Sequence, residues 1–272
     1  MSLSGKTLFI TGASRGIGRE IALKAATDGA NIVVAAKSAE AHPKLPGTIF
    51  SVAEEIVAAG GKALPLQLDV RDEEAVKVAM AQAAEHFGGI DALINNAGAI
   101  RLKGVEHLEP KRYDLMFQIN TRAVMVCSQA ALPYLKQSQG HILSLSPPLN
   151  LDPKWFASYG PYTTTKYGMS MLTLGMHEEF KKYGISVNAL WPKTVIATAA
   201  IEFEAGGPAV MKAARLPAIM ADAAYAILSS SGRSISGRLL IDEEILREQG
   251  QTDFEQYRYD PAGKLMTDLF VD

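Results

Sequence analysis

The sequence predicts an α/β protein built on a doubly wound parallel sheet. Three observations indicate this fold class: short apolar runs alternate with longer helical patterns, a glycine-rich turn directly follows the first apolar run, and no repeat or linker divides the chain. Strands that alternate with helices produce a parallel sheet covered on both faces. A length of 272 residues suits one large domain, so we expect residues 1–272 to form a single unit.

The elements are expected in a regular alternation. Apolar runs predict strands at residues 7–10, 31–36, 62–68, 92–94, 141–145, 186–190 and 237–241. Helical patterns between them predict helices at residues 16–26, 51–59, 72–87, 108–136, 161–182 and 221–229. The long segment 108–136 is expected to bend near Pro133. Ligands bind beyond the carboxyl ends of the strands in this class, so the loops there are the place to seek chemistry.

Several connections are longer than the fold requires. The segment 37–48 is long for a strand–helix connection, and the loop 147–160 carries aromatic residues. The loop 194–217 is rich in Ala and Gly, and we expect it to form a substrate lid. The polar tail 243–272 contains Phe254, Tyr257 and Tyr259. It packs either on its own domain or on a neighbouring subunit.

Composition narrows the class of protein. The formal net charge is −2 with no basic stripe, so nucleic-acid binding is not expected. The only cysteine, Cys127, lies in an apolar helical stretch and predicts a buried thiol in a reducing compartment. The N-terminus has no signal-peptide pattern, and no apolar run approaches the roughly 18 residues of a membrane span. We therefore expect a cytoplasmic protein without membrane insertion.

No metal site is expected. The five histidines, His42, His86, His107, His141 and His177, show no spacing typical of metal ligands. They are interpreted as structural or surface residues.

The glycine-rich turn has the pattern TGxxxGxG and joins the first strand to the first helix. Gly12 allows a tight turn, Gly16 lets the backbone approach a pyrophosphate, and Gly18 lets the helix pack near the strand. The free N–H groups at the helix N-terminus then hold the phosphate. The remaining candidate cofactor-binding residues of this turn are Ser14, Arg15 and Ile17.

Three motifs together resemble the short-chain dehydrogenase/reductase family. TGASRGIG is followed by Asn95-Asn96-Ala97-Gly98 and then by Tyr162-Thr-Thr-Thr-Lys166, in the family's order, and the resemblance extends from Ser4 to about Asp242. It implies a Rossmann fold, a nicotinamide cofactor, a small-molecule carbonyl or alcohol substrate, and a homodimer or homotetramer assembled through the long helices near 108–136 and 161–182.

The cofactor is expected to be NADP. A carboxylate after the second strand would bind the ribose of NAD and repel a 2′-phosphate, but Ala36 and Lys37 stand there. Lys37 and Arg15 suit a phosphate group. Each cation taken singly is also compatible with a solvated surface charge.

Further cofactor contacts are implied by the resemblance. It implies that Asp69 and Val70 bind the adenine. It implies that Asn95, Ala97 and Gly98 support the sheet and pass beside the ribose. It also implies that Val195 and Thr198 lie near the nicotinamide or the pyrophosphate. Asp69 could instead cap the helix that starts near Asp72. The family's usual Pro-Gly after the sixth strand is replaced here by Pro192-Lys193.

Tyr162 and Lys166 are the candidate catalytic pair. They are four residues apart in a helical pattern and share one face, where an ammonium group would lower the pKa of the phenol. The resemblance implies that Tyr162 exchanges a proton with the substrate and that Lys166 also binds the ribose. It further implies that Asn120 orders a water molecule in a proton relay.

The family's catalytic serine has no direct counterpart. Its expected position holds Pro147, with Ser146 next to it. In a regular strand Ser146 would face away from the site, whereas a bend before Pro147 would bring it back. Ser146 is the candidate for this role, with both orientations open.

Two functions follow from these residues. The first is an NADP-dependent oxidoreductase that interconverts a carbonyl and a hydroxyl group on an apolar, lipid- or steroid-like substrate. The alternative is a non-catalytic NADP-binding regulatory or scaffold protein, which Pro147 favours. Tyr162, Lys166 and Asn120 favour the enzyme. Substrate identity and reaction direction stay open.

Overall fold

Seven short segments pair into one parallel sheet in the computed structural model, which describes residues 2–43, 45–230 and 234–272. The strands are β1 (Thr7–Thr11), β2 (Asn31–Ala36), β3 (Lys62–Gln67), β4 (Ala92–Asn95), β5 (His141–Ser144), β6 (Ser186–Trp191) and β7 (Leu239–Ile241). Their order is β3-β2-β1-β4-β5-β6-β7, and every neighbouring pair is parallel. The chain reverses its direction of winding between β1 and β4, so the predicted doubly wound Rossmann fold is confirmed.

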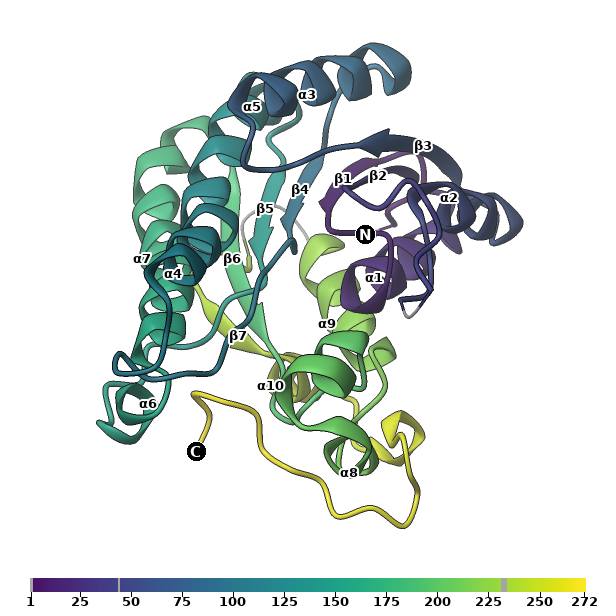
Figure 1. Cartoon of the computed structure of the whole chain (residues 1–272). Coiled ribbons are helices and arrows are strands. Elements are labelled where there is room, and N and C mark those ends of the chain that lie inside the picture. Colours follow the sequence, from purple (N-terminus) through teal and green to yellow (C-terminus); the bar gives the residue numbers. More distant parts are fainter. Residues whose placement is uncertain (1, 44, 231–233) are drawn as a thin grey trace.

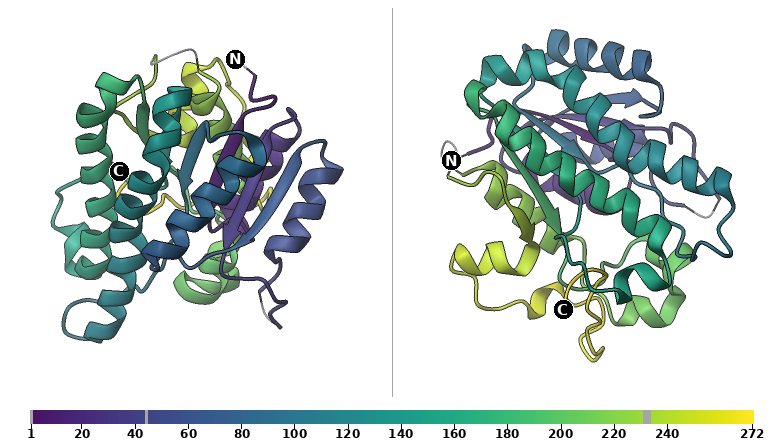
Figure 2. Two further views of the ribbon diagram at one scale, coloured as in Figure 1. Left: turned by 90° about the horizontal axis from the view of Figure 1, so that it is seen from above. Right: turned by 90° about the vertical axis from the view of Figure 1, so that its left-hand side faces the viewer.

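Helices cover both faces of this sheet (Figures 1 and 2). The helices are α1 (Gly16–Ala26), α2 (Ile49–Ala58), α3 (Glu73–Phe87), α4 (Pro110–Phe117), α5 (Ala123–Ser138), α6 (Lys154–Ala157), α7 (Gly160–Phe180), α8 (Gly207–Lys212), α9 (Ala218–Leu228) and α10 (Asp242–Glu248). Short helical turns are η1 (Gln118–Arg122), η2 (Lys181–Tyr183), η3 (Ile201–Ala205) and η4 (Glu255–Tyr257).

Each face of the sheet has its own apolar core. Leu8 and Ile10 point into the core beneath α1, α2 and α9, whereas Phe9 between them points into the core beneath α3, α5 and α7. This alternation follows from the two-residue period of a strand. Because the central strands are buried on both sides, apolar side chains occupy both of their faces.

The long helical segment differs from its prediction. It forms α4 and α5, joined by the π-helical turn η1, and α5 continues through Pro133 to Ser138. The interruption therefore lies around Asn120 rather than at Pro133. Wider π-turns of this kind often occur at functional sites.

The C-terminal tail packs on its own domain. After α10 the chain passes along α8 and returns to the carboxyl ends of the strands, where it ends (Figure 1). Phe254 and Tyr257 are buried, whereas Tyr259 is exposed. Phe270 is only 1% exposed and lies in an aromatic cluster near the end of the chain. Of the two alternatives for this tail, the structure shows the intramolecular one.

Candidate active site

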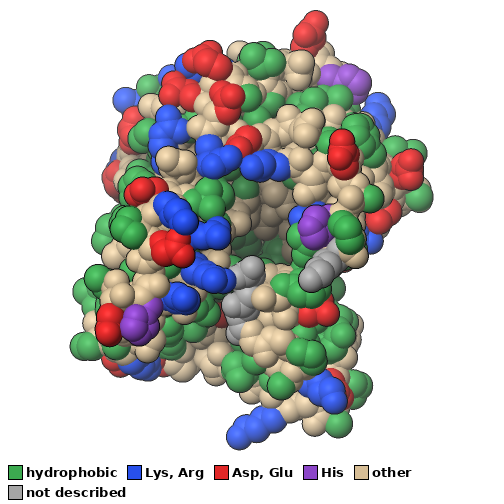
Figure 3. Space-filling view, in the orientation of Figure 1, with side chains coloured by type: hydrophobic (Ala, Val, Ile, Leu, Met, Phe, Trp, Pro, Cys, Tyr) green, Lys and Arg blue, Asp and Glu red, His purple; other side chains and the backbone are tan. Residues whose placement is uncertain are grey.

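A cavity of about 1100 Å³ lies beyond the carboxyl ends of the strands. It includes the point between β1 and β4 at which ligands bind in doubly wound sheets. Figure 3 shows the molecular face hollowed near its centre, with Lys and Arg side chains gathered along one side. Among the residues predicted from sequence, the cavity is lined by Gly12, Ser14, Arg15, Gly16, Ile17, Lys37, Asp69, Val70, Ala97, Gly98, Asn120, Tyr162, Lys166, Val195 and Thr198.

The glycine turn fits a pyrophosphate. Gly12 has a φ of +68°, and a Cβ atom there would lie 2.9 Å from the Cα of Ala97. Helix α1 begins at Gly16 with no acidic residue in its first turn and no side-chain cap on its N–H groups. Gly16 and Ile17 line the cavity, so the positive end of this helix is directed to it.

Gly18 and Asn95 support the cavity from outside its lining. A Cβ atom on Gly18 would meet Asn96 Nδ2 at 2.4 Å. That amide group donates to the carbonyl oxygens of Thr11 at 2.8 Å and of Gly12 at 3.1 Å. Asn96 thus clamps the glycine turn, a role that the sequence analysis missed although the residue stands inside the NNAG motif. Asn95 is buried, with its Nδ2 atom 3.5 Å from Ser144 Oγ.

Asp69 is held by two cations at the cavity wall. Its carboxylate accepts hydrogen bonds from Arg71 and lies 3.2 Å from Lys37 Nζ. These partners, Arg71 above all, hold the pKa of Asp69 well below its usual range, against the opposing effect of burial. The alternative role as a helix cap is wrong, because Asp72 caps α3 by accepting from the Ala75 N–H group at 3.0 Å.

Arg15 links the glycine turn to the loop after β2. Its guanidinium group donates to the carbonyl oxygens of Pro46 at 2.9 Å and Gly47 at 3.1 Å and to Ser38 Oγ at 3.1 Å. These acceptors are neutral, and no carboxylate of the described residues forms an ion pair with Arg15. Burial lowers the pKa of Arg15, but a guanidinium group stays charged at neutral pH.

Tyr162 and Lys166 lie on α7 with only 6% and 7% of their surfaces exposed. Lys166 Nζ donates to the carbonyl oxygen of Leu145 at 2.5 Å and lies 4.9 Å from the Trp191 ring centroid. Burial lowers the pKa of Lys166 to about 7, opposed by the negative charge of Asp268. Burial and the same charge raise the pKa of Tyr162 above its ordinary value. The expected lowering is therefore not found, because loss of solvent disfavours the phenolate.

Asn120 lies in the π-helical turn and uses both ends of its amide group. Oδ1 accepts from the Ala99 N–H group at 2.8 Å. Nδ2 donates to the Ala99 carbonyl oxygen at 3.0 Å and to Thr165 Oγ1 at 2.9 Å. Asn120 therefore fixes the loop after β4 against α7, beside Lys166. Its predicted role in ordering water stays a prediction.

The structure does not bring Ser146 to the cavity. Ser146 is fully buried, and its Oγ atom has no hydrogen-bond partner among the described residues. Leu145 lines the cavity instead, as expected where neighbouring side chains face opposite ways. Of the two orientations left open by the sequence, the structure shows the one that points away.

The C-terminal segment forms part of the cavity wall, through Met266, Thr267, Asp268 and Leu269. The Val195 N–H group donates to the Met266 carbonyl oxygen at 3.0 Å, and the Val195 carbonyl oxygen accepts from the Arg215 N–H group at 2.9 Å. Both backbone groups of Val195 are thus bonded within the protein. Its predicted place near the nicotinamide stays a prediction.

Asp268 is a cavity residue that the sequence analysis missed. The signal available was a single carboxylate inside the otherwise largely apolar run LMTDLFV. Such a residue at a chain end is usually solvated, so the pattern alone does not predict a site.

The segment 194–217 forms the apolar wall of the cavity. It contains η3 and α8, and Ile196, Ile201, Phe203 and Val210 line the space. Its position suits the predicted lid, and movement of this segment stays a prediction.

Among the described residues, no helix is long and apolar enough to cross a membrane. Within the same residues, no three His, Cys, Asp or Glu side chains are grouped as metal ligands would be.

Comparison with known proteins identifies similar chains. The family model described as short chain dehydrogenase matches residues 6–205. Hydroxysteroid dehydrogenase-like protein 2 of Xenopus laevis is 57% identical over 271 residues, which are 99% of this chain and 64% of that protein. This chain thus spans somewhat less than two thirds of that relative's length. The crystal structure of a putative dehydrogenase from Xanthomonas campestris has a TM-score of 0.96 and 52% identity, and the match covers 100% of both chains.

A more distant structure is a metagenomic short-chain oxidoreductase in complex with NADP. It has a TM-score of 0.72 and 27% identity, covering 89% of this chain and 98% of that one.

Proposed function

This chain belongs to the short-chain dehydrogenase/reductase family, and we propose that it is an NADP-dependent oxidoreductase that interconverts a carbonyl and a hydroxyl group. The observation that carries this proposal is the burial of Tyr162 and Lys166 in the cavity onto which the glycine turn opens. A phosphate site and a proton donor in one cavity are what reduction with a dinucleotide requires.

Tyr162 acts as the general acid or base. A bound nicotinamide supplies or accepts the hydride. In reduction the phenol proton of Tyr162 passes to the substrate oxygen, and in oxidation the proton returns. Its raised pKa makes the protonated form dominant, which suits the donor role. Lys166 lies one helical turn further along α7, where its Nζ atom donates to the Leu145 carbonyl oxygen.

The preference for NADP is supported by charge at the end of β2. Ala36 places no carboxylate there, and the guanidinium group of Arg15, bound by neutral acceptors among the described residues, lies beside it. Lys37 contributes less, because Asp69 pairs with it. The similar short-chain oxidoreductase seen in complex with NADP is consistent with this choice.

The substrate is proposed to be apolar and lipid- or steroid-like. The cavity beside the reaction centre is lined by Leu102, Leu115, Met116, Phe203 and Val210. A wall of this kind favours an apolar body, with the reacting oxygen directed to Tyr162. Similarity to hydroxysteroid dehydrogenase-like protein 2 points to the same class.

The alternative is a non-catalytic NADP-binding regulatory or scaffold protein. It is favoured by the absence of a β5 hydroxyl group from the described cavity wall, since Ser146 is buried elsewhere and Pro147 has none.

The test combines cofactor binding with turnover. The binding of NADPH and of NADH is titrated by fluorescence. Oxidation of the more tightly bound cofactor is then measured with each member of a panel of apolar ketones and aldehydes as substrate. We expect tighter binding of NADPH, a smaller preference in Arg15→Ala, and a 10²–10⁴-fold loss of turnover in Tyr162→Phe, roughly the contribution of a general acid. Tyr259→Phe, at an exposed tyrosine of the tail, is the matched control. NADPH binding with no Tyr162-dependent turnover would support the regulatory protein instead.

A further inference from the structure

The reaction centre lacks the hydrogen-bond donor that β5 was expected to supply. Tyr162 can protonate the substrate oxygen, but a second donor would stabilise the charge that develops there. Leu145 is the β5-side residue at the cavity, and Ser144 and Ser146 are both fully buried outside its lining. A donor in the described part of the cavity must therefore come from another element.

The C-terminal segment brings a carboxyl group to this place. The Asp268 N–H group donates to the Lys193 carbonyl oxygen at 3.0 Å, and the Trp191 indole N–H group donates to the Leu269 carbonyl oxygen at 2.9 Å. Phe270 follows, stacked on the Tyr162 ring at a centroid distance of 6.3 Å and an angle of 27°. The backbone of Asp268 is thereby anchored to the loop after β6, two residues before the ring that stacks on Tyr162.

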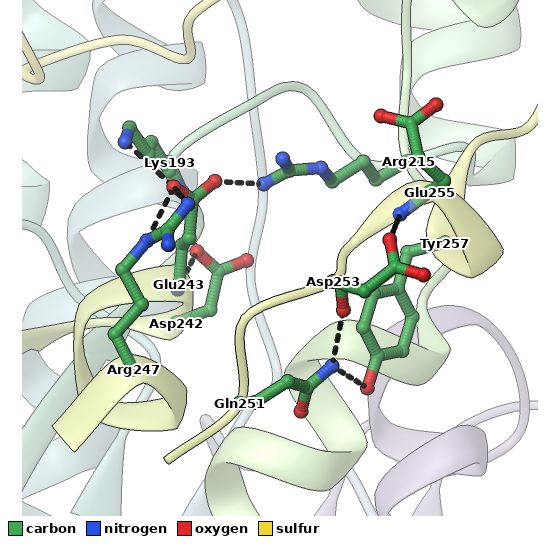
Figure 4. A network of polar contacts seen from close by, with 9 residues as sticks. All are labelled: Lys193, Arg215, Asp242, Glu243, Arg247, Gln251, Asp253, Glu255 and Tyr257. Carbon is green, nitrogen blue, oxygen red and sulfur yellow. Dashed lines mark hydrogen bonds and ion pairs between the residues drawn. The ribbon is translucent and has the colours of Figure 1, made fainter. Parts of the chain in front are cut away.

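The loop after β6, whose Lys193 carbonyl oxygen binds the Asp268 N–H group, is itself fixed by an ionic network. Lys193, Arg215 and Arg247 converge on Glu243, with Asp242 beside it (Figure 4). Asp242 Oδ1 accepts from the Lys193 N–H group at 2.9 Å. The backbone that pairs with Asp268 is therefore held rigidly, as a catalytic group requires.

The surroundings of Asp268 favour its neutral form. Burial is the largest effect and raises its pKa to about 7, and the negative charge of Asp242 acts in the same direction. The Leu269 N–H group, which donates to Asp268 Oδ1 at 2.7 Å, and the positive charge of Lys166 lower it. Tyr159 and Tyr162 are the other titratable groups that its charge affects. A carboxyl group with this pKa is largely protonated below neutral pH and then carries an O–H donor. Apolar enclosure that keeps a carboxylic acid neutral is a known way to make such a donor.

We propose that Asp268 is a further catalytic residue of the reductase reaction put forward above, on which this inference rests: its carboxylic acid group donates a hydrogen bond to the substrate oxygen that Tyr162 protonates. In reduction the carbonyl carbon receives the hydride and the C=O π electrons move to oxygen, which takes the phenol proton of Tyr162. Asp268 keeps its own proton throughout. The step therefore needs no further reactant.

The test compares substitutions at Asp268 with one at an exposed carboxylate of the same tail. Asp268→Leu removes the donor, Asp268→Asn retains an N–H donor of similar shape, and Asp272→Leu makes the first change at a residue outside the cavity lining. We expect Asp268→Leu to lower kcat about 10²–10³-fold, as loss of one such donor does, while the Kd for NADPH changes less than about threefold. Asp268→Asn should recover kcat to within about tenfold of wild type, and Asp272→Leu should leave it unchanged.

A second measurement does not depend on turnover. Infrared spectroscopy of the wild-type protein should show a protonated-carboxyl band that titrates near pH 7 and is missing in Asp268→Asn. Absence of that band would overturn the assignment, as would an unchanged kcat in Asp268→Leu or an equal loss in Asp272→Leu. If Tyr162→Phe removes turnover and Asp268→Leu does not, the Asp268 assignment alone fails. If turnover survives in Tyr162→Phe, the proposed function fails.

Discussion

Burial sets the protonation state of each titratable side chain in the reaction centre. It raises the pKa of Tyr162, lowers that of Lys166 to about 7 and raises that of Asp268 to about 7. All three shifts favour the neutral form, because removal from water penalises charge. A centre of this kind suits a neutral carbonyl group and a proton donor more than a preformed phenolate.

The same shift makes stability depend on pH at Asp268. Its pKa is raised from 3.8 to about 7 in the folded chain, so the native state holds a proton that the unfolded chain releases. This contribution is full below about pH 4 and is lost as the pH rises to about 7. The Asp268→Asn variant has no carboxyl group at this position, so it does not lose this stability as the pH rises. Its free energy of unfolding relative to that of wild type should therefore increase by roughly 2–3 kcal/mol between pH 5 and pH 8.

Urea unfolding at both pH values measures this difference. Asp272→Asn, an exposed carboxylate of the same tail with a lowered pKa, should not show an increase between pH 5 and pH 8. An equal increase in both variants would contradict the assignment of the effect to burial.

At the scale of elements, the sequence pattern was sufficient to predict a helix where residues close to it in the chain determine its structure. Helix α1 spans the predicted residues 16–26, since its glycine turn lies beside it in the chain. The π-helical turn η1 could not be predicted, because Asn120 is held there by Ala99 and Thr165, one of which is 45 positions away. Helices α6 and α8, of four and six residues, are too short to show a period.

A substitution at Gly18 tests how closely α1 must approach the NNAG segment. A Cβ atom would lie 2.4 Å from Asn96 Nδ2 and displace the clamp on the glycine turn. Gly18→Ala should lower the free energy of unfolding by about 1–3 kcal/mol, the cost of overpacking, and should weaken NADPH binding. Gly160→Ala is the control, because a Cβ atom on Gly160 meets no atom within 4 Å. Thermal unfolding should show a change of no more than about 0.5 kcal/mol for that control.

At the scale of the whole molecule, the tail completes the cavity from the far end of the sequence. Its residues follow β7, yet Met266 pairs with Val195 and Phe270 packs on Tyr162. Neither contact has a signature in the local pattern, so the sequence left the tail free to pack on either of two partners. The doubly wound sheet and the glycine turn were predictable because each has a periodic or local pattern. The wall that carries Asp268 depends on tertiary contacts alone.

The outer side of α4, α5 and α7 is proposed as the surface through which the chain forms a homodimer or homotetramer. These helices lie together on one side of the sheet (Figure 1) and expose Phe117, Met125, Met171 and Leu174, with Met171 59% exposed. Exposed apolar side chains gathered on neighbouring helices mark association surfaces.

Met171→Glu places a charge on this surface, and burying an unpaired charge in an interface is costly. We expect light scattering after size-exclusion chromatography to show a dimer or tetramer for wild type and a smaller species for Met171→Glu. Val57→Glu changes an equally exposed residue on α2, across the sheet, and should leave the mass unchanged. A wild-type protein that is monomeric at micromolar concentration would contradict the proposal, as would dissociation by both variants alike, since the effect would then not be specific to α7.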